Sequence, residues 1–135
     1  SNKGFSLIEL MVVVGVIAIL AGLVLGIYKV YWEKAKVLVD TLPAARSCML
    51  QLLSYCGEHP SQDVPVSDMK QCQNRTTLFG YTTFNVPQVT CTASGELPDN
   101  YTVEANTTAS MHYYSKCVFK DKAFRCLLVS GQPTD

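Results

Sequence analysis

The chain opens with an apolar stretch and continues as an amphipathic helix pattern. Residues 10–27 are eighteen uncharged, mostly apolar residues in a row, which is enough for a helix that spans a membrane. The helical pattern then continues to residue 56, with apolar positions three and four residues apart on one face. These positions are Leu38, Leu42, Ala45, Met49, Leu52 and Cys56. The spacing predicts one long helix over residues 5–56, ending near Gly57.

The flanks of the amphipathic half carry opposite charges at helical spacing. Lys29 with Glu33, and Lys36 with Asp40, stand four residues apart. Pairs at this spacing are neighbours on a helix surface and attract each other. We therefore expect both pairs on exposed flanks of the helix.

The C-terminal half alternates between strand-like runs and turn residues. Residues 58–77 are polar and are expected to form a loop. Five runs rich in β-branched and aromatic residues follow, with Gly, Pro, Asn or Asp between them. The expected strands are residues 78–84, 88–93, 101–106, 112–120 and 123–129. An antiparallel sheet of four to five strands on the second half of the helix would bury both apolar faces, which makes an α+β fold.

Composition narrows the class of protein. The chain has 135 residues and no net charge, and residues 57–135 carry six basic and eight acidic side chains. Beyond the apolar helix, the remaining residues suffice for one small domain. A slightly acidic domain does not suggest strong general binding to nucleic acid.

The cysteines point to disulfides. All six follow the apolar stretch: Cys48, Cys56, Cys72, Cys91, Cys117 and Cys126. Such a density favours an oxidising compartment. There is no C-x-x-C pair, and His59 and His112 are the only histidines. We therefore expect no zinc site, and no metal or cofactor of any other kind.

One disulfide can be argued from register. A tight turn at residues 121–122 would place Cys117 directly opposite Cys126, at a non-hydrogen-bonded position where side chains come closest. Cys48 and Cys56 are eight residues apart, about 12 Å along a helix, which is too far for a bridge. Each therefore pairs with either Cys72 or Cys91. The pairings Cys56–Cys72 and Cys48–Cys91 are favoured because the shorter loop closes more easily.

A single carboxylate stands directly before the apolar run. Glu9 would cost free energy at the edge of hydrocarbon unless a cation pairs with it, although it could also lie at the level of the lipid headgroups. The surrounding segment, KGFSLIELMVVVGVIAILAG at residues 3–22, resembles the N-terminus of type IV pilins and of the type II secretion pseudopilins. The resemblance implies cleavage by a prepilin peptidase between Gly4 and Phe5, with Lys3 as the basic residue of the leader. It also implies methylation of the new Phe5 amine, and pairing of Glu9 with the amine of a neighbouring subunit.

The resemblance implies an organisation for the whole chain. Residues 1–4 would be a leader remnant, residues 5–28 a transmembrane helix that becomes the filament core, and residues 29–135 a globular pilin domain. The family often has Pro where this chain has Gly26, so loosening of the helix there is open. A removable signal peptide is the less favoured alternative, because the apolar core exceeds the roughly 7–15 residues usual for one.

The function implied is structural, and no enzyme is expected. The chain would be a subunit of a type IV pilus, a fibre of cell adhesion and twitching motility. Its partners would be copies of itself, the bacterial inner membrane, the prepilin peptidase and the pilus assembly machinery, and its final location would be the extracellular filament. One alternative is a pseudopilin of type II secretion or competence.

Two further sites remain as weaker expectations. A minor pilin could bind DNA, or another surface ligand, through the basic hairpin residues Lys116, Lys120, Lys122 and Arg125, which stand among aromatic residues. A solvated hairpin with its aromatic side chains in the core explains the same pattern. Asn106, in the run EANTT, matches the N-glycosylation acceptor pattern.

Overall fold

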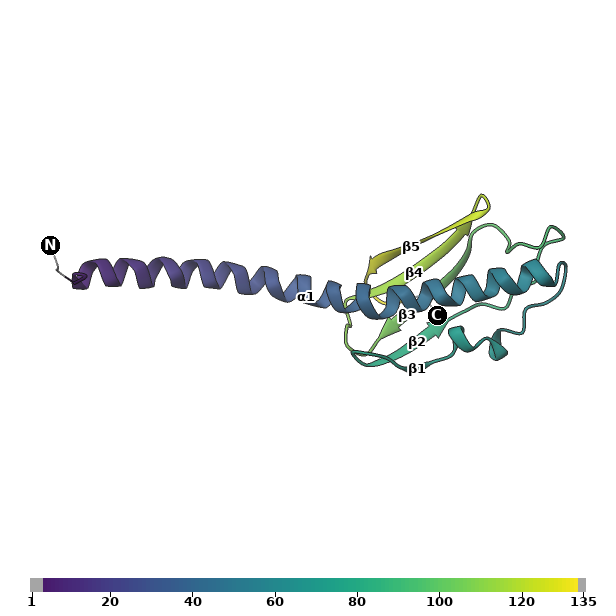
Figure 1. The fold of residues 1–135 in the computed structure, drawn as a ribbon, viewed down its shortest axis with the longest axis horizontal. Helices are drawn as coiled ribbons and strands as arrows, with labels where there is room; N and C mark the ends of the chain where they lie inside the picture. Colours follow the sequence, from purple (N-terminus) through teal and green to yellow (C-terminus); the bar gives the residue numbers. More distant parts are fainter. Residues whose placement is uncertain (1–3, 134–135) are drawn as a thin grey trace. The chain divides into compact units, whose positions relative to one another are not determined.

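The computed structural model describes residues 4–133 and divides the chain into two compact units. One unit ends at Trp32 and the other begins at Glu33. A single helix, α1 (Leu7–Glu58), contributes to both (Figure 1). Its bounds differ by two residues at each end from the predicted helix.

The second unit contains a five-stranded antiparallel sheet in which the strands follow in chain order. The strands are β1 (Arg75–Thr76), β2 (Tyr81–Asn85), β3 (Tyr101–Thr107), β4 (Tyr113–Lys120) and β5 (Ala123–Ser130). Two short 3-10 helices, η1 (Val66–Asp68) and η2 (Lys70–Cys72), precede β1. The α+β fold with a long helix on an antiparallel sheet is confirmed.

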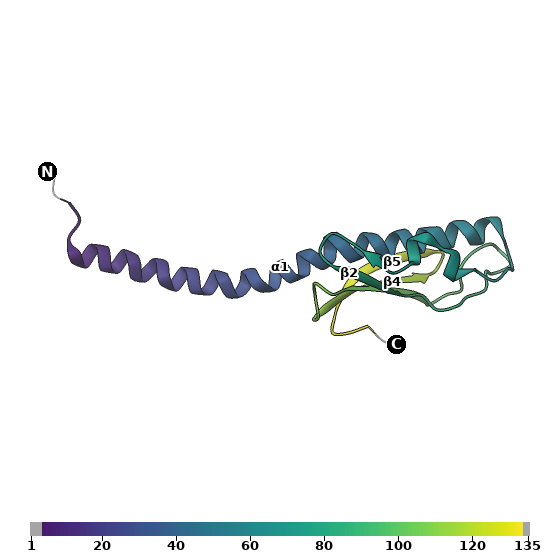
Figure 2. The same ribbon diagram turned by 90° about the horizontal axis from the view of Figure 1, so that it is seen from below.

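The core of the second unit lies between α1 and one face of the sheet (Figure 2). Met49 and Leu52 from the helix and Val103 from β3 are fully buried there. Because side chains alternate along a strand, the opposite sheet face carries polar residues such as Thr102 and Lys116. Burial of these apolar side chains holds the helix on the sheet.

The start of the buried helix face differs from the prediction. Leu38 is 44% exposed, whereas Val37 and Thr41 are fully buried. Thr41 can be accommodated because its hydroxyl is 2.9 Å from the Val37 carbonyl oxygen and 2.7 Å from Ser115 Oγ of β4. Asp40, expected on an exposed flank, is also buried. From Ala45 onward the predicted face is confirmed, since Ala45, Met49, Leu52 and Cys56 are all fully buried.

One predicted strand does not join the sheet, and one short strand was missed. Residues 88–93 form only an isolated bridge, Asp63 with Thr90. The Val64 amide donates to the Val89 carbonyl and the Cys91 amide to the Gln62 carbonyl. The segment therefore pairs with the loop after α1 instead of the sheet. The two-residue strand β1 lies within the stretch expected to be loop.

Three disulfides close the second unit. Cys117 is bonded to Cys126, and the two residues are register partners in the β4–β5 hairpin, as the sequence predicts. The other two predicted pairings, Cys56–Cys72 and Cys48–Cys91, are wrong. The structure bonds Cys48 to Cys72 and Cys56 to Cys91.

Tertiary packing explains the exchange of partners. After α1 ends, the loop turns back along the helix, and the Gln71 amide donates to Gln51 Oε1 at 2.8 Å. Cys72 therefore lies beside Cys48 and not beside Cys56, although Cys56 is closer to it in the sequence. Cys91 follows the segment that pairs with residues 62–64, close to the end of α1, and so reaches Cys56. Loop-closure entropy favours the shorter loop only for a flexible chain, and this loop is packed.

Candidate processing and assembly site

The first turn of α1 is fixed by a reciprocal pair of hydrogen bonds. Ser6 precedes the first helical residue, and its hydroxyl accepts from the Glu9 amide at 3.2 Å. The Glu9 carboxylate in turn accepts from the Ser6 amide at 3.4 Å. This is a capping box, which satisfies two amides that the helix itself leaves without acceptors. The negative charge of Glu9 is also favourable at the positive end of the helix dipole.

Ser6 is the residue of this site that the sequence analysis missed. The signal was present in the sequence, because a Ser three residues before a Glu and just before an apolar run is a recognised helix start. The capping box also leaves the Glu9 carboxylate accessible. This carboxylate accepts only one long, exposed hydrogen bond among the described residues, from the Ser6 amide, so a cation from another molecule can replace that amide at small cost in free energy.

The residues of the expected cleavage site precede the helix. Gly4 and Phe5 are exposed and non-helical, and Phe5 is 85% exposed. Lys3, the expected basic residue of the leader, lies outside the described residues. An exposed segment outside regular secondary structure is the form of backbone that proteolysis prefers.

The side chains of the apolar half of α1 are exposed along its whole length. An 18-residue window of the helix has a mean hydropathy of 3.0, and none of it is buried. The helix is therefore long and apolar enough to cross a membrane. Exposed apolar surface of this extent marks a segment made for lipid or for other protein.

The four cations of the basic hairpin differ in how exposed they are. Lys116 is half-buried, whereas Lys120, Lys122 and Arg125 are exposed. Lys116 and Lys120 share the sheet face that points away from α1, because both alternate with the buried Cys117. Arg125 is the register partner of Val118 and therefore lies on this same face, while Lys122 lies in the turn. No observation favours DNA as the ligand of these four cations.

Asn106 lies in the central strand β3 and is half-buried. Its side-chain carbonyl accepts a hydrogen bond from the Thr83 hydroxyl of β2. Glycan acceptors usually lie on surface loops, so this environment differs from the usual one.

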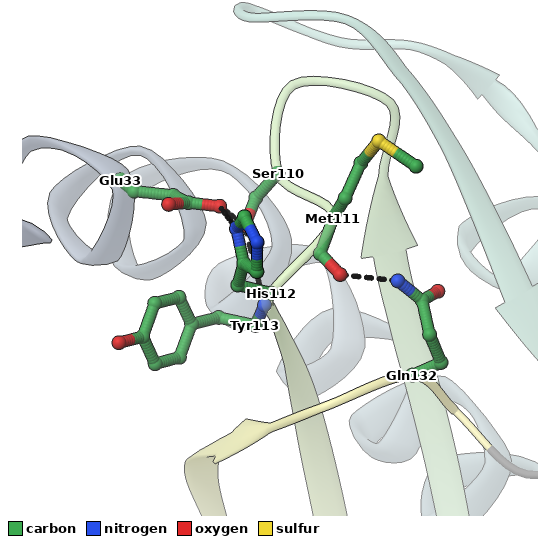
Figure 3. A network of polar contacts seen from close by, with 6 residues as sticks. All are labelled: Glu33, Ser110, Met111, His112, Tyr113 and Gln132. Atoms are coloured by element: carbon green, nitrogen blue, oxygen red, sulfur yellow. Dashed lines mark hydrogen bonds and ion pairs between the residues drawn. The ribbon is translucent and has the colours of Figure 1, made fainter.

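A polar cluster joins α1 to the loop before β4 (Figure 3). Glu33 Oε1 accepts from Ser110 Oγ at 2.9 Å and from His112 Nδ1 at 2.8 Å. The hydrogen bond from His112, helped by the one from Ser110, holds the pKa of Glu33 below its ordinary value of 4.5, against the opposing effect of burial. The carboxylate lies between the hydroxyl and the imidazole, so the imidazole is not placed to take the Ser110 proton. The cluster has the form of a structural clamp.

The remaining chemistry of the described part is limited. Within residues 4–133, no three His, Cys, Asp or Glu side chains come together as metal ligands would. All six cysteines are in disulfides and cannot serve as nucleophiles.

Comparison with known proteins identifies the N-terminal segment. Residues 1–25 match the family model described as the prokaryotic N-terminal methylation motif. Searches of curated proteins and of solved structures found no match. The motif agrees with the capped helix start, the exposed Phe5 and the apolar helix described above. Residues 1–25 thus carry the N-terminal methylation motif, which is the signature of type IV pilins and pseudopilins.

Proposed function

We propose that this chain is a structural subunit of a type IV pilus. The observation that carries the proposal is the position of Glu9, in the first turn of an exposed apolar helix and inside the methylation motif. The motif implies processing by a prepilin peptidase and assembly into a filament. A structural role, and not a catalytic one, follows from the same motif.

The proposed mechanism depends on a proton-bearing amine that cleavage creates. Cutting between Gly4 and Phe5 frees the Phe5 amine, which is then methylated and carries a positive charge. In the filament, Glu9 of one subunit exchanges its hydrogen bond from Ser6 for the Phe5 amine of a neighbour. Opposite charges attract strongly in apolar surroundings, and an unpaired one there is costly. The pair would thereby fix the axial position of each incoming helix.

The two parts of the chain then have separate tasks. Residues 5–28 would anchor the precursor in the inner membrane and later pack as the filament core, since both environments exclude water. Residues 29–135 would form the domain exposed outside the inner membrane and then on the filament. Three disulfides suit that location, because an oxidising compartment maintains them and each constrains the unfolded chain.

The first test is intact-mass spectrometry of filaments sheared from cells that express the full chain. The proposal expects a major species that begins at a methylated Phe5 and has lost six hydrogens through three disulfides. Absence of the chain from every surface filament, in cells that contain the processed protein, would contradict it.

A pseudopilin of type II secretion or competence is the second candidate, since the same motif serves both classes. The two candidates differ in where the processed protein accumulates. A pseudopilin stays in the cell envelope, and its deletion blocks secretion or DNA uptake without removing surface fibres.

A further inference from the structure

An open groove runs between α1 and the edge strand β5. It has a volume of about 800 Å³. Its floor is apolar, with Leu42, Pro43, Leu53, Phe119 and Phe124 among the lining residues. Basic residues surround that floor, as the following contacts show.

Arg46 and Lys122 are the clearest cations of the groove. Arg46 is exposed on α1, and its guanidinium carbon is 5.7 Å from the centre of the Phe124 ring. Lys122 lies in the turn between β4 and β5, and Arg125 follows on the edge strand. Glu96 is the single carboxylate among the lining residues. The groove is therefore apolar with a net positive rim, which favours an acidic segment that also brings apolar side chains.

The same unit carries such a segment. Residues 57–69 comprise the last two residues of α1 and the chain that follows as far as η2. They contain Glu58, Asp63 and Asp68 and no Lys or Arg. All three carboxylates are exposed. Pro60 is exposed as well, while Pro65 and Val66 are partly exposed, so apolar groups accompany the charges. We call residues 57–69 the acidic loop.

The part of the acidic loop that carries η1 lies on the flank of α1 opposite to the groove. Figure 1 shows β5 on one side of the helix and the segment that carries η1 and η2 on the other. A single chain therefore cannot place this part of its own loop in its own groove. Two copies side by side can, with the groove of one facing the loop of the next. Contacts of this head-to-tail kind form rings when the rotation between copies closes and open helical assemblies when it does not.

We propose that the groove between α1 and β5 binds the acidic loop of a neighbouring copy of this chain. The inference rests on the proposed function and adds the lateral contact between globular domains to it. Charge complementarity would select the register of neighbours, and the apolar floor would supply contact area. DNA fits the groove less well, because its phosphates would meet the cations but would bring no aliphatic side chains to the apolar floor.

Charge reversal in the full chain tests the contact. We expect Arg46→Glu with Lys122→Glu, or Glu58→Lys with Asp68→Lys, each to lower the yield of sheared filaments by roughly tenfold, because like charges then meet across the interface. Combining the four substitutions restores opposite charges and should recover most of the yield. The matched control compares Lys122→Glu alone with Lys120→Glu, which makes the same change of charge at an exposed lysine of the hairpin outside the groove and should leave the yield unchanged.

Cross-linking with a carbodiimide provides a second measurement on the unmodified protein. This reagent joins a carboxylate to a lysine amine in direct contact. Lys122 should become linked to Glu58, Asp63 or Asp68 in intact filaments and not in detergent-dispersed chains.

The outcomes separate this inference from the proposed function. If the unmodified chain forms filaments and the reversed variants form them equally well, or the fourfold variant fails to recover, the groove contact is wrong while the filament role stands. If reversal of the groove cations leaves filaments intact but weakens retention of DNA, the groove binds a polyanion instead. If the unmodified chain enters no filament, the proposed function itself fails.

Discussion

Asp40 shows how a single residue can join a helix to a distant turn. Its carboxylate accepts hydrogen bonds from Thr77 Oγ1 at 2.7 Å and from the amides of Leu78 at 3.3 Å and Phe79 at 3.2 Å. A buried carboxylate is stable only when such donors replace water. Asp40 thereby fixes the turn between β1 and β2 against α1.

Replacing Asp40 with Ala should lower the free energy of unfolding by about 2 kcal/mol, because two partly buried amides and a hydroxyl lose their charged acceptor. Urea unfolding of the full chain in mild detergent measures the change. Val39→Ala is the control, since Val39 is 58% exposed and surface substitutions usually change stability by less than about 0.5 kcal/mol. Equal effects of the two substitutions would show that the turn does not depend on Asp40.

Glu33 should make stability depend on acid. Because its folded pKa is below the ordinary value, the unfolded chain binds the proton more readily in the acidic range. The contribution of Glu33 is therefore complete above the ordinary carboxyl range and is lost as the pH falls through the lowered pKa. Glu33→Gln should flatten this part of the profile, which unfolding midpoints between about pH 3 and pH 7 would record. A His112→Ala profile that stays unchanged from the parent would contradict the assignment to His112.

At the scale of elements, the two halves of α1 differ in solvent exposure. Every residue of the apolar first half is exposed, whereas the sheet covers one face of the second half. The helix continues through Pro43, which removes one backbone hydrogen bond on an exposed side. The disulfides then join the second half to the loop and to the segment before β3.

The disulfides should stabilise the fold unequally. Cys56–Cys91 spans 35 residues and Cys117–Cys126 spans 9. A longer closed loop removes more entropy from the unfolded chain, so replacing the first pair with Ala should cost about 1 kcal/mol more than replacing the second. Thermal unfolding of the two double variants tests the order. Peptide mapping should also recover Cys48 linked to Cys72, and a Cys56–Cys72 peptide would refute the packed-loop explanation.

At the scale of the whole molecule, Glu9 is expected to matter for assembly and not for folding. It lies in the unit that ends at Trp32, apart from the disulfide-closed unit. Glu9→Gln removes the charge and retains an acceptor for the Ser6 amide, so the helix start should survive. Pairing with a charged amine would be lost.

Glu9→Gln should therefore reduce filament yield by roughly tenfold or more, since a tenfold change in the association constant corresponds to only about 1.4 kcal/mol of interaction free energy. Glu33→Gln is a matched control on the same helix and should still assemble. Yields are compared by immunoblot of sheared filaments against total processed chain. Normal assembly of Glu9→Gln would remove the proposed role of the carboxylate.

The sequence by itself determined the long helix, four of the five strands of the sheet and the N-terminal motif. The apolar run, the amphipathic spacing and the β-rich runs identified α1, β2, β3, β4 and β5, because hydrophobic periodicity reflects local geometry. The register of one hairpin located Cys117–Cys126 for the same reason. The methylation motif is likewise a continuous segment, so it could be recognised in the sequence without knowledge of the fold.

Only the tertiary structure decided what depends on how distant segments pack. It exchanged the partners of Cys48 and Cys56, because the loop after α1 folds back along the helix. It buried Asp40 and exposed Leu38, because the sheet and the β1–β2 turn cover a different side of the helix at the start of the buried face. It also set the basic groove and the segment that carries η1 on opposite flanks of α1. Each of these outcomes is a contact between residues far apart in the chain, which no local pattern specifies.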